Sequence, residues 1–119
     1  MERKRLQTIL KALHSGLNSA LGERVEKVIL YGSQARGEAH DDSDIDVLVV
    51  LREEFDYGEM LRCTSHLVAA LSLENDVVIS RAFVSKAKYE QCKVPFLMNV
   101  RREGIAIWNA GHSQQRRSA

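Results

Sequence analysis

Cysteine is scarce in this sequence, and no cysteine motif is present. Cys63 and Cys92 stand far apart, outside any CxxC spacing and without a paired histidine motif. The redox and metal chemistry that depends on such motifs is therefore not indicated. We expect both residues to be reduced thiols in the core of a cytoplasmic protein.

The sequence also lacks a strong net charge. Its 17 lysine and arginine residues nearly balance 16 aspartates and glutamates, which leaves a net charge of +1. This excludes a global field that attracts nucleic acid or an anionic membrane. Any anionic substrate has to be held by local groups.

Long apolar runs are absent as well. No segment reaches the roughly 18 apolar residues expected of a membrane-spanning helix. The basic start, Met1–Arg5, leads into an amphipathic segment that Lys11, His14 and Asn18 interrupt, so a signal peptide is not indicated. The 119 residues suit one domain, and we expect a soluble, cytoplasmic protein.

Apolar periodicity predicts alternating helices and strands. Leu6–Leu21 has the spacing of one helical face, and Gly22 is expected to end this helix. Ile45–Leu51 is almost wholly apolar, which is typical of a strand covered on both faces. The other expected elements are strands at 25–31, 76–84 and 105–108, the last at an edge, and helices at 60–73, 86–92 and 95–103. This order predicts an α/β domain, and residues 109–119 have no apolar pattern and are expected to be disordered.

Local signals refine these elements. Strict alternation in strand 25–31 places Val25 on the side of Ile29 and Tyr31, opposite Val28 and Leu30. Leu61, Leu67, Val68 and Leu71 form the expected apolar stripe of helix 60–73. Ser85 is expected to cap the helix at 86–92, Pro95 to start the next helix, and Gly104 to end it.

Two carboxylates stand at the start of a buried strand. Asp44 and Asp46 are two residues apart, so they point to the same face while Ile45 points into the core. Magnesium is commonly held by one or two carboxylates together with substrate phosphates and water. The pair therefore indicates metal-assisted phosphoryl chemistry, although either acid alone is more often a solvated strand end.

A Gly-Ser turn follows the preceding strand. Gly32 allows backbone to approach a phosphate, the Ser33 hydroxyl can donate to a phosphate oxygen, and the N–H groups at a helix start favour an anion. The ten residues 34–43 suffice for a helical turn and a loop that returns the second strand beside the first. Arg36 is either a forked donor to the phosphates or a solvated residue near Glu38, Asp41 and Asp42.

A third acid precedes a later strand. Asp76 lies in the segment Asn75–Ile79, where we expect the strand 76–84 to begin. By itself an Asn-Asp pair is ordinary loop chemistry. Beside the other two acids, Asp76 is predicted to complete a second metal site or to take a proton from the attacking hydroxyl.

The combined pattern resembles the minimal nucleotidyltransferases of the DNA polymerase beta superfamily. The resemblance rests on Gly32-Ser33-x10-Asp44-x-Asp46, with Ala35-Arg36-Gly37 inside it, and on the segments 75–79 and 99–105. It covers residues 5–108 and implies a single nucleotidyltransferase domain with a small mixed sheet of about four strands flanked by helices. It also implies two Mg2+ ions and an NTP donor, with Gly32 and Ser33 on the triphosphate and Asp44, Asp46 and Asp76 as the acids.

Many members of this group resemble antitoxins encoded beside HEPN-domain toxins. That resemblance implies a type VII toxin–antitoxin pair in which AMP passes from ATP to a tyrosine of the toxin. One alternative is a binding module that neutralises the toxin by docking alone. Another is modification of a small molecule, which is disfavoured because 119 residues leave little room for an acceptor domain.

Overall fold

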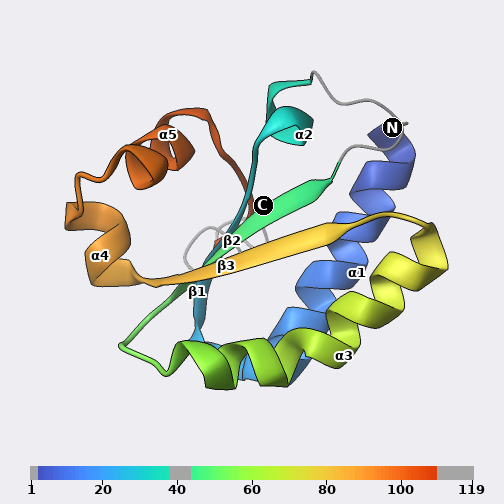
Figure 1. The fold of residues 1–119 in the computed structure, drawn as a ribbon, viewed down its shortest axis with the longest axis horizontal. Helices are drawn as coiled ribbons and strands as arrows, with labels where there is room; N and C mark the ends of the chain where they lie inside the picture. The colour runs from blue at the N-terminus through green and yellow to red at the C-terminus, as the bar shows by residue number, and fades with distance from the viewer. Residues whose placement is uncertain (1–2, 38–43, 110–119) are drawn as a thin grey trace, which may run out of the picture.

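The computed structural model describes residues 3–37 and 44–109, which form one sheet with helices on both faces (Figure 1). In chain order the elements are α1 (Arg3–Leu21), the 3-10 turn η1 (Gly22–Arg24), β1 (Val25–Tyr31), α2 (Ser33–Arg36), β2 (Ile45–Leu51), α3 (Tyr57–Asn75), β3 (Ile79–Ser85), α4 (Lys86–Gln91), α5 (Pro95–Glu103) and β4 (Ile105–Asn109). The predicted acidic loop at Glu38, Asp41 and Asp42 and the tail from 110 lie outside the described residues.

The sheet is mixed and four-stranded, as expected. Its strand order is β3-β2-β1-β4, with β2 and β3 parallel and β1 antiparallel to both β2 and β4. α3 makes the crossover that a parallel pair requires. The predictions that β1 is an inner strand and β4 an edge strand are confirmed.

Helices cover the two faces of the sheet with separate apolar clusters. α1 and α3 pack on one face against Ile45, Val47 and Val49, whereas α4 and α5 pack on the other face against Leu48 and Val50 (Figure 1). Alternating residues of β2 thus serve opposite cores, which explains why this strand is almost wholly apolar. Asp46 belongs to the α4/α5 face, at the end where β2 begins.

The predicted start and stop signals are confirmed. α1 ends at Gly22, whose φ of 60° suits the left-handed end of a helix. The Ser85 hydroxyl accepts a hydrogen bond from the backbone N–H of Lys88 at 3.3 Å and so caps α4. Pro95 is the first residue of α5, and Gly104 ends this helix.

Four local expectations are wrong. The register between β1 and β2 shifts between Val25 and Lys27, and this irregularity returns Val25 to the core of Val28. β3 begins at Ile79 instead of position 76, because α3 extends to Asn75. The last two concern side chains of α3: Leu61 and Cys63 are exposed.

Within the described part of the chain, no helix is both long and apolar enough to cross a membrane.

The packing of α1 generates a stability prediction. Leu13 of α1 is 0% exposed, so Leu13→Ala removes buried methyl groups and should cost about 2–5 kcal/mol of unfolding free energy. Leu73 of α3 is 86% exposed, and Leu73→Ala should stay within about 0.5 kcal/mol of the parent protein. Urea denaturation measures the unfolding free energy of both variants, and the m-value should be unchanged. Equal losses in the two variants would contradict the assignment of Leu13 to the core.

Candidate active site

Asp44 and Asp46 lie at the start of β2 with the geometry that the sequence predicted. Asp44 is exposed just before the strand, Asp46 is half-buried within it, and Ile45 between them is fully buried on the opposite face. Burial, and then the negative charge of Asp44, raise the pKa of Asp46 above its ordinary value. The two carboxylates are therefore close enough to repel each other.

Gly32 lies directly against the Asp46 carboxylate. The antiparallel register pairs Tyr31, the last residue of β1, with Asp46, so the turn that follows β1 meets the start of β2. Gly32 has φ 77° and ψ −157°, a conformation that essentially only glycine adopts. A Cβ atom here would stand 2.7 Å from Oδ2 of Asp46. Pairing of these two strands thus joins the predicted phosphate turn to the predicted metal ligands.

The turn continues into one turn of helix. Ser33 starts α2, and the Gly32 carbonyl accepts hydrogen bonds from the backbone N–H groups of Ala35 (3.1 Å) and Arg36 (3.2 Å). Gly37 ends α2 in the left-handed region, with φ 73°. The half-buried Ser33 is therefore held in the segment that adjoins the carboxylate pair.

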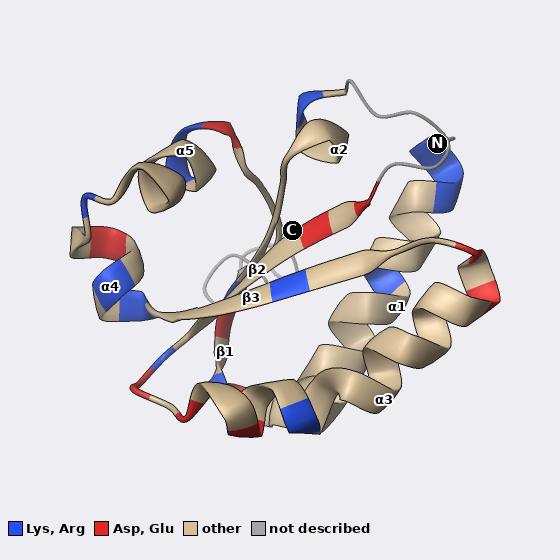
Figure 2. Ribbon diagram, in the orientation of Figure 1, with Lys and Arg blue, Asp and Glu red and all other residues tan. Residues whose placement is uncertain are grey.

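Arg36 forms an ion pair that the sequence did not predict. Its Nη1 lies 3.8 Å from Oε2 of Glu103, the last residue of α5, and both side chains are exposed. The pair links α2 to α5 across the end of the sheet where β2 begins. Figure 2 shows the basic end of α2 and the acidic start of β2 at this same end.

Tyr31 and Phe96 extend the site with aromatic rings that sequence reasoning did not assign to it. Their rings meet edge to face, with centroids 5.3 Å apart and an interplanar angle of 83°. Burial, and then the Asp46 carboxylate, raise the pKa of Tyr31. The position of Tyr31 immediately before Gly32 was the one signal that could have linked it to the site.

The structure does not bring Asp76 together with the other two acids. Asp76 is exposed and caps the end of α3 in the left-handed region, with φ 53°, three residues before β3. Figure 2 shows the acidic end of α3 apart from the acidic start of β2. Among residues 3–37 and 44–109, no three His, Cys, Asp or Glu side chains are grouped so that they can hold a metal ion.

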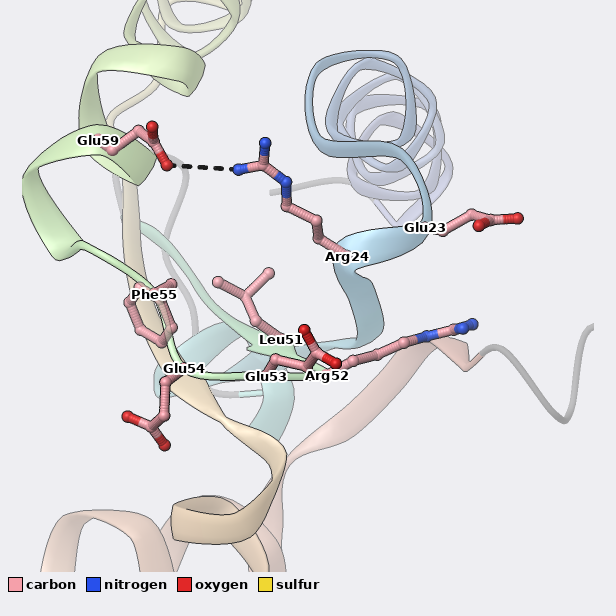
Figure 3. A pocket seen from close by; sticks show the side chains of 8 residues that line it. All are labelled: Glu23, Arg24, Leu51, Arg52, Glu53, Glu54, Phe55 and Glu59. Atoms are coloured by element: carbon pink, nitrogen blue, oxygen red, sulfur yellow. Dashed lines mark hydrogen bonds and ion pairs between the residues drawn. The ribbon is translucent and has the colours of Figure 1, made fainter.

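A pocket of about 420 Å³ lies at the opposite end of β2 (Figure 3). Leu51, the last residue of the strand, lines it together with Phe55, and charged side chains surround them. Arg24 and Glu59 form an ion pair across it at 3.4 Å. This pocket contains none of the predicted site residues.

The residues at the start of β2 fit a divalent cation. Magnesium prefers oxygen ligands and needs only one or two carboxylates when phosphates and water fill its other positions. Asp44 and Asp46 supply two carboxylates on one face, and a cation between them would relieve their mutual repulsion. At Gly32 only backbone lies against the Asp46 carboxylate, because a Cβ there would stand 2.7 Å from Oδ2.

The chain is similar in sequence to several known proteins. Residues 17–111 match the family described as polymerase beta, nucleotidyltransferase. The protein MJ0604 of Methanocaldococcus jannaschii is 34% identical over 99 residues, which are 83% of this chain and 94% of that protein. The protein adenylyltransferase MntA of Thermococcus cleftensis is 32% identical over 80 residues, 67% of this chain and 79% of that protein.

A similar fold occurs in a solved toxin–antitoxin complex. That structure holds a tri-AMPylated HEPN toxin of Shewanella oneidensis with an MNT antitoxin. The matching chain has a TM-score of 0.59 and 15% identity, and the match covers 92% of this chain and 76% of that chain. At this identity the likeness concerns the fold.

The contact between Gly32 and Asp46 yields a prediction with a matched control. Gly32→Ala should lose about 1–3 kcal/mol through backbone strain and should also displace the Asp46 carboxylate, which weakens Mn2+ binding. Gly37→Ala carries a left-handed strain of about 1–2 kcal/mol, but its Cβ has no neighbour within 4 Å. Urea denaturation and Mn2+ titration check the pair. Unchanged Mn2+ affinity in folded Gly32→Ala would contradict the role assigned to the contact.

Proposed function

The chain belongs to the polymerase beta nucleotidyltransferase family, and on this basis we propose that it is a protein adenylyltransferase. It transfers AMP from ATP to the hydroxyl of a tyrosine on a partner HEPN toxin. The transfer silences the toxin, so the chain acts as the antitoxin of a type VII pair. The proposed place of action is the cytoplasm. One relative and one structural neighbour support this proposal by their names: the adenylyltransferase MntA, and the MNT antitoxin found with an AMPylated HEPN toxin.

One observation carries the proposal: Gly32 packs against Asp46, and Asp44 lies on the same face. This arrangement joins a backbone turn suited to phosphate with two carboxylates suited to a divalent ion. A nucleoside triphosphate needs both features, because its phosphates carry charge that a metal and local donors have to offset. A chain with a net charge of +1 has no strong global field for this task.

The reaction is a substitution at the α-phosphorus of ATP. The acceptor hydroxyl oxygen forms a bond to this phosphorus, the bond to the bridging oxygen of the β-phosphate breaks, pyrophosphate leaves, and the hydroxyl proton passes to water. When bound, Mg2+ would offset the charge that develops in this step. Asp44 and Asp46 would hold the ion, whereas Gly32, Ser33 and Arg36 hold the triphosphate.

Loss of one metal-binding carboxylate tests the mechanism. Asp46→Asn should slow transfer of label from α-labelled ATP to the partner roughly 1,000-fold, because metal stabilisation of several kcal/mol is lost. Asp56→Asn is the control, since Asp56 is an exposed acid that pairs with Arg62 at the start of α3. Wild-type rates in Asp46→Asn would show that the mechanism is wrong.

Mass spectrometry of the co-expressed toxin adds a second test: an inactive toxin in stable complex without added AMP would show docking alone.

The role of Arg36 is tested through substrate affinity. Arg36→Gln should raise KM for ATP roughly 10–100-fold with little change in kcat, because a charge-assisted hydrogen bond contributes about 1.5–3 kcal/mol. Arg62→Gln removes another exposed arginine of an ion pair and should leave KM unchanged. Steady-state kinetics with saturating partner protein measures both. An unchanged KM in Arg36→Gln would limit Arg36 to its structural pair with Glu103.

A further inference from the structure

Ser80 stands directly beside Asp46 in the sheet. In the parallel pairing of β2 and β3, Ile45 is opposite Ile79 and Asp46 is opposite Ser80. Paired residues of neighbouring strands point to the same face and lie roughly 4.8 Å apart. Alternation along β3 agrees, because Ala82 and Val84 belong to the same α4/α5 face as Leu48 and Val50. The Ser80 side chain therefore shares a face with Asp46.

Three half-buried polar positions thus form a row across the sheet. Tyr31 of β1, Asp46 of β2 and Ser80 of β3 are laterally paired, with Asp46 in the centre. Gly32 adjoins this row, with only its backbone against Asp46. A side chain at position 80 is consequently in the place from which a further ligand would reach an ion on Asp46.

The backbone holds Asp76 away from this row. The N–H groups of Asp76 and Val77 both donate to the Ser72 carbonyl, which fixes Asp76 as the cap of α3. Strand pairing begins only later, where the Ile45 N–H donates to the Val78 carbonyl at 2.9 Å. The register therefore places Asp76 four positions before the residue that faces Asp46.

We propose that the metal site of this chain contains two carboxylates, those of Asp44 and Asp46. Ser80 occupies the position of the third ligand, and Asp76 is a helix cap outside the site. This inference rests on the proposed function for its metal. It differs from the sequence-based expectation, in which Asp76 completes a second site. Two carboxylates suffice for Mg2+ when phosphates supply further ligands, and a neutral hydroxyl adds no third negative charge beside Asp46.

Titration of the full-length protein with Mn2+, followed by electron paramagnetic resonance without nucleotide, tests this assignment. Asp76→Asn should bind Mn2+ as the parent protein does. Ser80→Asp should bind Mn2+ roughly tenfold more tightly, because affinity rises with the number of charged ligands. Ser80→Asn is the control of similar size without charge, and it should show no gain. Asp46→Asn should lose binding.

The opposite pattern would overturn the proposal. If Asp76→Asn weakens Mn2+ binding tenfold or more while its thermal unfolding is unchanged, Asp76 is a ligand. If Ser80→Asp folds but binds Mn2+ no more tightly than Ser80→Asn, Ser80 does not face the ion. The Asp76→Asn comparison does not depend on the folding of Ser80→Asp, and asparagine tolerates the left-handed backbone of position 76. Failure of the parent protein to adenylylate a partner would refute the proposed function, yet it would leave the Mn2+ comparison intact.

Discussion

The antiparallel pairing of β1 with β2 is the constraint on which the rest of the site depends. It places Tyr31 opposite Asp46, so the turn after β1 meets the first residues of β2. At the point of contact there is room for a backbone and no side chain, because a Cβ on Gly32 would stand 2.7 Å from Asp46. A shift of one residue in this register would turn the carboxylates to the other face and separate them from the turn.

The strand that begins at the acids, β2, contributes residues to both apolar clusters. Ile45, Val47 and Val49 pack under α1 and α3, whereas Leu48 and Val50 pack under α4 and α5. Asp46 is therefore anchored by buried neighbours on both sides, and its backbone has little freedom to move. Such rigidity keeps Asp46 where the negative charge of Asp44 raises its pKa.

The elements were predictable where a local signal determined them. Gly22, Ser85 and Pro95 mark helix ends through backbone geometry and hydrogen bonds that involve only near neighbours. One prediction failed because a distant contact prevailed over the local pattern. The irregular pairing at Val25 arises between two strands, and the alternation of one strand cannot reveal it. The predicted start of β3 failed for a local reason: Asp76 looks like a strand residue by its apolar successors, but α3 continues to Asn75 and takes Asp76 as a cap.

The sequence by itself determined the chemistry of the site: a glycine-serine turn, two carboxylates on one strand face and a buried residue between them. These features follow from residue type and from the two-residue period of a strand. Only the tertiary structure decided which side chains share the site. It placed Tyr31 and Ser80 beside Asp46 and Phe96 against Tyr31, paired Arg36 with Glu103, and held Asp76 apart. Such neighbours depend on strand register and helix packing, which join residues far apart in the chain.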